Sequence, residues 1–164
     1  MENHPTICSL VLAAGKGSRM KGYEGNKALL PLVPGSDPFH GTESILSTIL
    51  EALPPGRKGI VVHHRKEDVI YATRGMGLAY ILQPELNGTG GALLAARDFV
   101  ESAGEQWMII TMGDVPFVRK STYLRLAEVL EECHLAVLGF KPEERRQYGV
   151  VEIESGRVRK ITEW

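Results

Sequence analysis

The sequence has little of what marks a nucleic-acid-binding protein, a protein with a histidine- or cysteine-ligated metal, or a membrane protein. Its 19 Lys and Arg residues are balanced by 20 Asp and Glu residues, so the net charge is −1. Without a basic excess, we expect neither a nucleic acid nor an anionic membrane as partner. The five histidines show no metal-ligand spacing. The apolar run 7–14 is too short to span a bilayer and lacks the positive flank of a signal peptide.

Cysteine is equally scarce. Cys8 and Cys133 are the only two, and they match no zinc or redox spacing. One pair does not make the disulfide scaffold of a small secreted protein. Because each lies beside an apolar run, we expect both to be small buried residues in a reducing compartment, and the protein to be cytoplasmic.

The chain is long enough for one domain spanning residues 1–164. A domain of this size buries about 70% of the surface of its unfolded chain, so it needs no disulfide or metal to fold. Apolar residues make up 43% and charged residues 24%, which are ordinary globular values. There is no internal repeat, no low-complexity segment and no linker, which favours a single compact fold.

Apolar runs typical of buried strands alternate with amphipathic stretches typical of helices. Such alternation predicts βαβ units and an α/β fold, Rossmann-like with three α/β/α layers and a mostly parallel central sheet. Expected strands cover 7–14, 59–63, 78–82, 107–112 and 135–140, and a hairpin pairs 149–154 with 157–161. Expected helices cover 42–53, with Thr42 as N-cap, 66–74, 92–103 and 121–132. Residues 15–41 are expected to form a loop.

Ligands of such sheets bind beyond the carboxyl ends of the strands, where three polar or glycine-rich segments follow. The first is Gly15-Lys16-Gly17-Ser18-Arg19-Met20-Lys21. Its glycines would let backbone N–H groups approach a phosphate, and its cations add charge. The segment is not a Walker A loop, and Met20 stands where a dinucleotide fingerprint has its third glycine. Taken alone, it could equally be a plain strand-to-helix turn.

Two charged residues could bind a ligand at the same carboxyl edge of the sheet. Lys27 precedes an apolar stretch, although in isolation a solvated lysine is the better interpretation. Asp114 is the one aspartate of four that directly follows a buried strand, where a carboxylate could hold Mg²⁺. Its alternative role is to cap the following turn.

The segment 83–91, Gln-Pro-Glu-Leu-Asn-Gly-Thr-Gly-Gly, follows another strand. The Gln83 amide can both donate and accept hydrogen bonds, which suits the edge of a base such as uracil. Gly88 and Thr89 could place backbone groups and a hydroxyl near the base or ribose. The alternative is that Thr89 caps the next helix.

Together these segments resemble the sugar-phosphate nucleotidylyltransferase family. Residues 12–20, Leu-Ala-Ala-Gly-Lys-Gly-Ser-Arg-Met, are similar to its opening signature LAAGxGxRM. The order of the later motifs also matches, and the closest likeness is to the uridyltransferase domain that acts on N-acetylglucosamine 1-phosphate. Those motifs are Lys27 ahead of Leu-Pro-Leu, Gln83-xxxx-Gly88-Thr89, Gly113-Asp114-Val115-Pro116, Tyr148-Gly149 and Ile161-Thr162-Glu163.

The resemblance implies a Mg²⁺-dependent reaction that joins a nucleoside triphosphate, with UTP favoured, to a sugar 1-phosphate and releases pyrophosphate. It implies that Arg19 and Lys27 neutralise the triphosphate, that Asp114 holds Mg²⁺, and that Gly149 and Glu163 touch the sugar. The nucleotide-binding residues it implies are Leu12, Ala13, Ala14, Gly15, Lys16, Gly17, Ser18 and, for the base, Gln83, Gly88 and Thr89.

The residues agree with such a reaction, because the attacking phosphate has a second pKa of about 6 and is mostly ionised at pH 7. No general base is then needed, and alignment with charge neutralisation suffices. Two other functions stay open. One is a cofactor nucleotidylyltransferase of the molybdopterin guanylyl or cytidylyl type. The other is a nucleotide-binding module without turnover.

Two features depart from the family pattern. The residue before the catalytic lysine is usually proline, and here it is Asn26. Family catalytic domains also continue well beyond the length reached at Trp164. The resemblance therefore implies that the part completing the sugar pocket, with a second metal ligand, is absent from this chain.

Overall fold

The computed structural model describes residues 6–17, 20, 22–102, 104–144 and 148–162. The backbone forms two compact units, Met1–Glu128 and Val129–Trp164, which are treated one at a time. The first unit contains a parallel sheet of four strands in the order β5-β4-β1-β6. These strands are β1 (Ile7–Leu12), β4 (Lys58–Val62), β5 (Ala79–Leu82) and β6 (Trp107–Met112). The expected parallel sheet is confirmed, with strand bounds within two residues of the prediction.

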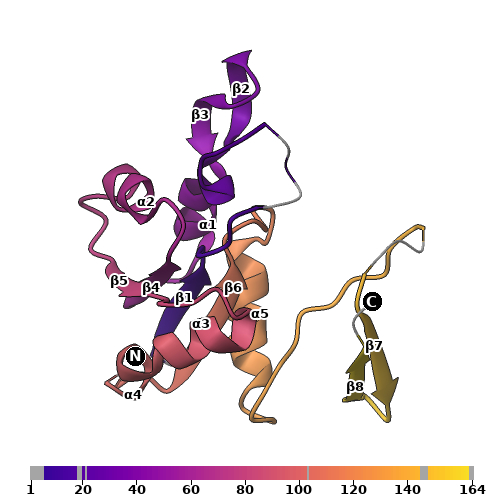
Figure 1. Cartoon of the computed structure of the whole chain (residues 1–164). Helices are drawn as coiled ribbons and strands as arrows, with labels where there is room; N and C mark the ends of the chain where they lie inside the picture. The colour runs from indigo at the N-terminus through magenta and orange to yellow at the C-terminus, as the bar shows by residue number, and fades with distance from the viewer. Residues whose placement is uncertain (1–5, 18–19, 21, 103, 145–147, 163–164) are drawn as a thin grey trace. The chain divides into compact units, whose positions relative to one another are not determined.

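Strand β1 lies inside the sheet and is buried throughout, as its unbroken apolar run predicts. Its side chains alternate between two cores because successive residues of a strand point to opposite faces. Val11 packs with α1 (Ile45–Ala52), α2 (Lys66–Ala72) and α5 (Lys120–Val129). Leu10 and Leu12 pack with α3 (Thr89–Ala95) and α4 (Arg97–Glu101) on the other face. Helices therefore cover both faces of the sheet, which gives the three layers expected (Figure 1).

The segment 15–41, expected to form a loop, contains regular secondary structure. It holds a short 3₁₀ helix, η1 (Lys27–Leu29), and a hairpin of β2 (Pro31–Asp37) and β3 (His40–Ser44). Its prolines hid the hairpin, because proline is tolerated only in edge strands and a two-stranded ribbon is all edge. Thr42 lies in β3, so its expected capping role is wrong. Ser44 caps α1 instead, and its Oγ accepts a hydrogen bond from the Ser47 N–H at 3.1 Å.

The helix expected at 92–103 begins earlier and is broken. It starts at Thr89, and its chain leaves the helical conformation at Ala96 (φ −88°, ψ 6°), so that α3 and α4 are separate. Glycine is a poor helix former, so the sequence pattern predicts a helix that begins only after Gly90 and Gly91. The helix expected at 121–132 is found as α5, which ends at Val129.

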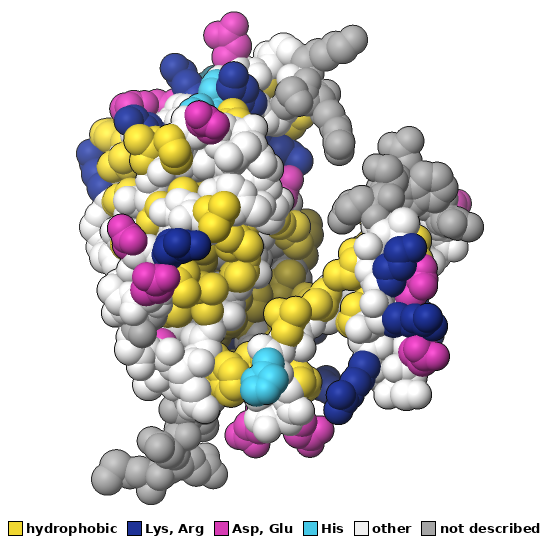
Figure 2. Space-filling view, turned by 60° about the horizontal axis from the view of Figure 1, so that its bottom comes forward, with side chains coloured by type: hydrophobic (Ala, Val, Ile, Leu, Met, Phe, Trp, Pro, Cys, Tyr) yellow, Lys and Arg dark blue, Asp and Glu magenta, His cyan; other side chains and the backbone are white. Residues whose placement is uncertain are grey.

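The second unit contains the expected hairpin, formed by β7 (Val150–Glu154) and β8 (Arg157–Thr162). The strand expected at 135–140 is wrong, since this segment has no regular structure. Leu135 and Phe140 are 79% and 69% exposed, and hydrophobic side chains are visible on the surface in Figure 2. An apolar run becomes a strand only when a neighbouring strand pairs with its N–H and C=O groups, and no strand described here pairs with this one.

Within the described part of the chain, every helix is too short or too polar to cross a bilayer. Cys8 is buried as expected, and burial raises the pKa of its thiol, which disfavours the reactive thiolate. Cys133 is partly exposed, so the expectation that it is buried is wrong. Neither cysteine forms a disulfide.

Candidate functional site

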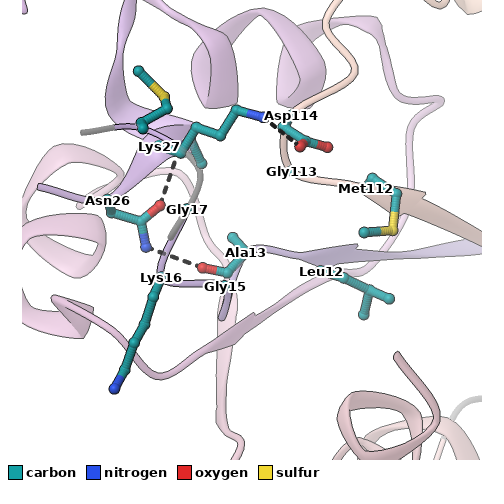
Figure 3. A pocket seen from close by; sticks show the side chains of 12 residues that line it. Leu12, Ala13, Gly15, Lys16, Gly17, Asn26, Lys27, Met112, Gly113 and Asp114 are labelled. Atoms are coloured by element: carbon teal, nitrogen blue, oxygen red, sulfur yellow. Dashed lines mark hydrogen bonds and ion pairs between the residues drawn. The ribbon is translucent and has the colours of Figure 1, made fainter. Parts of the chain in front are cut away.

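The carboxyl ends of the four parallel strands meet at one edge of the first unit, and a pocket of about 380 Å³ opens there beside β1 and β6 (Figure 3). Three segments far apart in the sequence line it. They are the end of β1 with the glycine-rich loop (Leu12, Ala13, Gly15, Lys16, Gly17, Met20), the turn containing η1 (Asn26, Lys27, Ala28) and the end of β6 (Met112, Gly113, Asp114). Pockets of this volume commonly hold small ligands.

The loop after β1 continues the hydrogen bonding of the sheet before it turns away. The Ala13 N–H donates to the Val61 carbonyl at 2.9 Å. Gly17 then has φ +62°, a left-handed conformation that favours glycine. The exposed Lys16 side chain points away from Lys27 and Asp114 (Figure 3).

Ala14, an expected member of this site, does not line the pocket. It is buried in the core beneath α3 and α4. Ser18 and Arg19 lie outside the described residues, and so does Glu163. Gly149 belongs to the second unit, where it directly precedes β7.

Lys27 and Asp114 form an ion pair at the pocket, with 2.9 Å between Nζ and Oδ2. They are 87 residues apart in the sequence. Their side chains are 41% and 39% exposed, so the pair is partly solvated. Such pairs contribute about 0–1 kcal/mol to stability. A ligand that brings both an anion for Lys27 and a cation for Asp114 could therefore replace this pair at little cost.

Gly113 places Asp114 close to the end of β1. Its N–H donates to the Leu12 carbonyl at 2.8 Å. A Cβ at position 113 would lie 2.9 Å from that carbonyl oxygen and 3.0 Å from the Ala13 Cβ. The two strand ends are therefore too close for any residue larger than glycine.

Asn26 is a buried polar residue of the pocket that the sequence interpretation did not assign to the site. Its amide nitrogen donates to the carbonyls of Ala13 (3.0 Å) and His64 (2.9 Å). Its amide oxygen accepts from the Ala28 N–H at 3.0 Å and so caps η1. An asparagine just before a short helix is a capping signal, and that signal could have identified it.

Gln83 lies at the carboxyl end of β5, on the same edge of the sheet but with β4 between it and β1. Its side chain is buried, and Nε2 donates to Asn87 Oδ1 (3.0 Å) and to the Gly88 carbonyl (3.2 Å). Gly88 has φ +92° and precedes α3, whose first residue is Thr89. Thr89 therefore does not act as the N-cap. None of Gln83, Gly88 and Thr89 lines the pocket beside Lys27.

Asp114 is the one acidic side chain among the pocket residues. The other aspartates are elsewhere: Asp37 binds the backbone of its hairpin, Asp68 pairs with Arg65, and Asp98 lies in α4. Within the described ranges no three acidic, His or Cys side chains cluster as a metal cage. One carboxylate nevertheless fits Mg²⁺, which proteins often hold by one or two carboxylates together with substrate phosphates and water.

Fold and pocket together define an α/β protein with a glycine-rich loop, a lysine and a carboxylate at the carboxyl edge of a parallel sheet, where such folds bind their ligands. The chain belongs to the MobA-like NTP transferase domain family, which it matches over residues 9–161. The family relationship expected from the sequence motifs is thereby confirmed.

A curated relative is the bifunctional protein GlmU of Novosphingobium aromaticivorans. It is 36% identical over 160 residues, which cover 96% of this chain and 34% of the relative. The chain thus spans about a third of the length of the curated relatives it matches.

Solved structures show the same fold. A nucleotidyl transferase from Methanothermobacter thermautotroptrophicus aligns with a TM-score of 0.61 and 26% identity, over 75% of this chain and 57% of that one. Rv0371C from Mycobacterium tuberculosis, solved in complex with manganese, aligns with a TM-score of 0.56 and 19% identity, over 78% and 61% of the two chains.

Proposed function

We propose that this chain is a nucleotidyltransferase that joins a nucleoside triphosphate, with UTP favoured, to a sugar 1-phosphate and releases pyrophosphate with the help of Mg²⁺. The observation that carries the proposal is the pairing of Lys27 and Asp114 beside the glycine-rich loop. A pocket with a cation, a carboxylate and exposed backbone suits a triphosphate that arrives with its metal. The family and its GlmU relatives support this class of reaction.

In the proposed reaction an oxygen of the sugar phosphate attacks the α-phosphorus. The bond from the α-phosphorus to the bridging oxygen breaks, and pyrophosphate leaves with that electron pair. The attacking phosphate is already ionised at neutral pH, so no side chain has to remove a proton. What the protein must supply is alignment and neutralisation of the charge on the triphosphate.

Each part of the pocket has a role in this proposal. Leu12, Ala13 and the loop of Gly15 to Ser18, with Ala14 behind them, hold the nucleoside and its phosphates. Lys27, joined by Arg19, neutralises phosphate charge. Asp114 would hold Mg²⁺, which supplies further neutralisation when bound; the manganese complex of the Mycobacterium tuberculosis protein supports a divalent cation. Gly149 and Glu163 are proposed to contact the sugar.

Base selection is proposed for Gln83, Gly88 and Thr89. The Gly88 carbonyl orients the Gln83 amide. A carbonyl oxygen can only accept a hydrogen bond, so the donor Nε2 of Gln83 must face the Gly88 carbonyl. The hydrogen bonds of this amide within the described structure all use its nitrogen, which leaves Oε1 to accept one. Uracil and thymine present a donor at N3, whereas cytosine presents an acceptor there. This arrangement therefore favours UTP or dTTP over CTP.

Replacing Gln83 by alanine is expected to reduce the preference for UTP over CTP by about fivefold, the equivalent of one hydrogen bond of about 1 kcal/mol. The measurement is the ratio of the two dissociation constants by calorimetry. Gln106→Ala, a change of the same kind at the opposite end of the sheet, is the control. An unchanged ratio in the Gln83 variant would show that Gln83 only braces the loop at Asn87 and Gly88.

The name of the matched family favours one other candidate, a cofactor guanylyl- or cytidylyltransferase of the molybdopterin type. The test is pyrophosphate release with UTP, dTTP, CTP, GTP and ATP, each with Mg²⁺ and with either a panel of sugar 1-phosphates or the molybdopterin cofactor as acceptor. Release with UTP and a sugar 1-phosphate supports the proposal. Release with GTP or CTP and the cofactor favours the cofactor transferase, and nucleotide binding without release to either kind of acceptor favours a binding module.

A further inference from the structure

The Asn26 carboxamide connects three segments at the base of the pocket. Its two N–H groups reach the end of β1 at Ala13 and the residue pair after β4 at His64, and its oxygen reaches η1 at Ala28. The residue is 2% exposed. Its backbone carbonyl accepts from Leu29 N–H (2.9 Å) and from the Tyr23 hydroxyl (3.3 Å). The residue directly before Lys27 is thus fixed through both its side chain and its backbone.

Capping η1 does not require all of these bonds. An N-cap needs only an acceptor, which serine or aspartate also provides. The two donated bonds serve another purpose, because they attach the start of η1 to the ends of two central strands. One of their acceptors, Ala13, belongs to the pocket wall, and Lys27 reaches Asp114 across the same pocket.

We propose that Asn26 is a positioning residue for Lys27. Asn26 holds the backbone of Lys27 against the ends of β1 and β4, so that the Lys27 ammonium group faces the phosphates. A lysine side chain has four rotatable bonds, so its reach is defined only if its backbone is fixed. The proposal rests on the proposed function, in which Lys27 meets a triphosphate. It assigns to Asn26 no contact with the substrate.

The first test is a double-mutant cycle on binding of Mg²⁺-UTP and of UMP, which lacks the β- and γ-phosphates. Asn26→Ala is expected to weaken UTP binding by about tenfold and UMP binding by less than twofold. In a Lys27→Ala background the same change is expected to have no further effect on UTP. Independent losses that multiply, or equal losses for UTP and UMP, would overturn the proposal.

The second test needs no nucleotide. The NMR signal of the Lys27 Cε, assigned with Lys27→Arg, is compared among wild type, Asp114→Asn and Asn26→Ala. We expect Asn26→Ala to move the signal to its position in Asp114→Asn, because Lys27 no longer holds the pair. An unmoved signal would overturn the proposal. If the wild type binds no nucleotide but the signal moves, the proposed function fails and the positioning role stands.

Two further variants separate positioning from folding. Ser44→Ala removes a helix cap of the same kind, outside the pocket, and is expected to leave UTP affinity and the Lys27 signal unchanged. Asn26→Ser keeps an acceptor that can cap η1 but lacks both donated bonds. Because positioning depends on the donated bonds, we expect the serine variant to match Asn26→Ala in UTP affinity and in the Lys27 signal. A serine variant with wild-type values would contradict positioning through the donated bonds.

Discussion

Asp114→Asn is expected to lower Mg²⁺-dependent pyrophosphate release by about 10³-fold while leaving the chain folded. An amide is nearly the same size as a carboxylate but is neutral, so it binds Mg²⁺ poorly. The metal is expected to supply several kcal/mol of charge stabilisation, and about 4 kcal/mol corresponds to 10³-fold. Folding should be little affected, because the pair with Lys27 is partly solvated.

The measurement compares pyrophosphate release and circular dichroism for the wild type, Asp114→Asn and Asp98→Asn. Asp98 lies in α4, away from the pocket, and undergoes the same chemical change. We expect Asp98→Asn to behave as wild type. Retained activity in Asp114→Asn would remove this residue from the metal role.

The second large effect is expected for Lys27→Met, which keeps the length of the side chain and removes its charge. We expect turnover to fall by about 10²–10³-fold, the usual loss when one group that stabilises developing negative charge is removed. Without Lys27 to compete for its carboxylate, Asp114 should also bind Mg²⁺ more tightly in the absence of nucleotide.

Kinetics and calorimetry with Mg²⁺ alone test both parts of this prediction. Lys58→Met is the matched control, since Lys58 begins β4 at the end of the sheet remote from the pocket. Unchanged turnover would exclude Lys27 from phosphate binding. Unchanged or weaker affinity for Mg²⁺ would show that the ion pair does not compete with the metal.

Much of the fold follows from local sequence pattern. The buried run of β1 and its alternation with helices predict a parallel sheet, and a parallel sheet places the segments after β1, β5 and β6 on one edge. Residues 135–140 show the limit of such reasoning. An apolar pattern indicates that a segment tends to be buried. A strand also needs a neighbouring strand to pair with, and the local pattern carries no information about that neighbour.

The sequence predicts which residues belong to the site better than it predicts how those residues contact one another. Lys27 and Asp114 could each be assigned from their places after a loop and a strand, yet their direct pairing depends on how η1 meets the end of β6. In the sequence, Asn26 differs from other residues only by its departure from the family pattern. Its three partners come together only when the ends of β1 and β4 and the start of η1 meet, so no local pattern shows them.

The central claim is that the pocket beside Lys27 and Asp114 binds a nucleoside triphosphate together with its metal. A calorimetric titration of the wild-type chain with UTP, dTTP, CTP, GTP and ATP, each with and without Mg²⁺, tests it most directly. We predict binding that requires Mg²⁺, favours UTP or dTTP, and is lost in Asp114→Asn. Binding that ignores both Mg²⁺ and Asp114, or no binding of any nucleotide, would contradict the account.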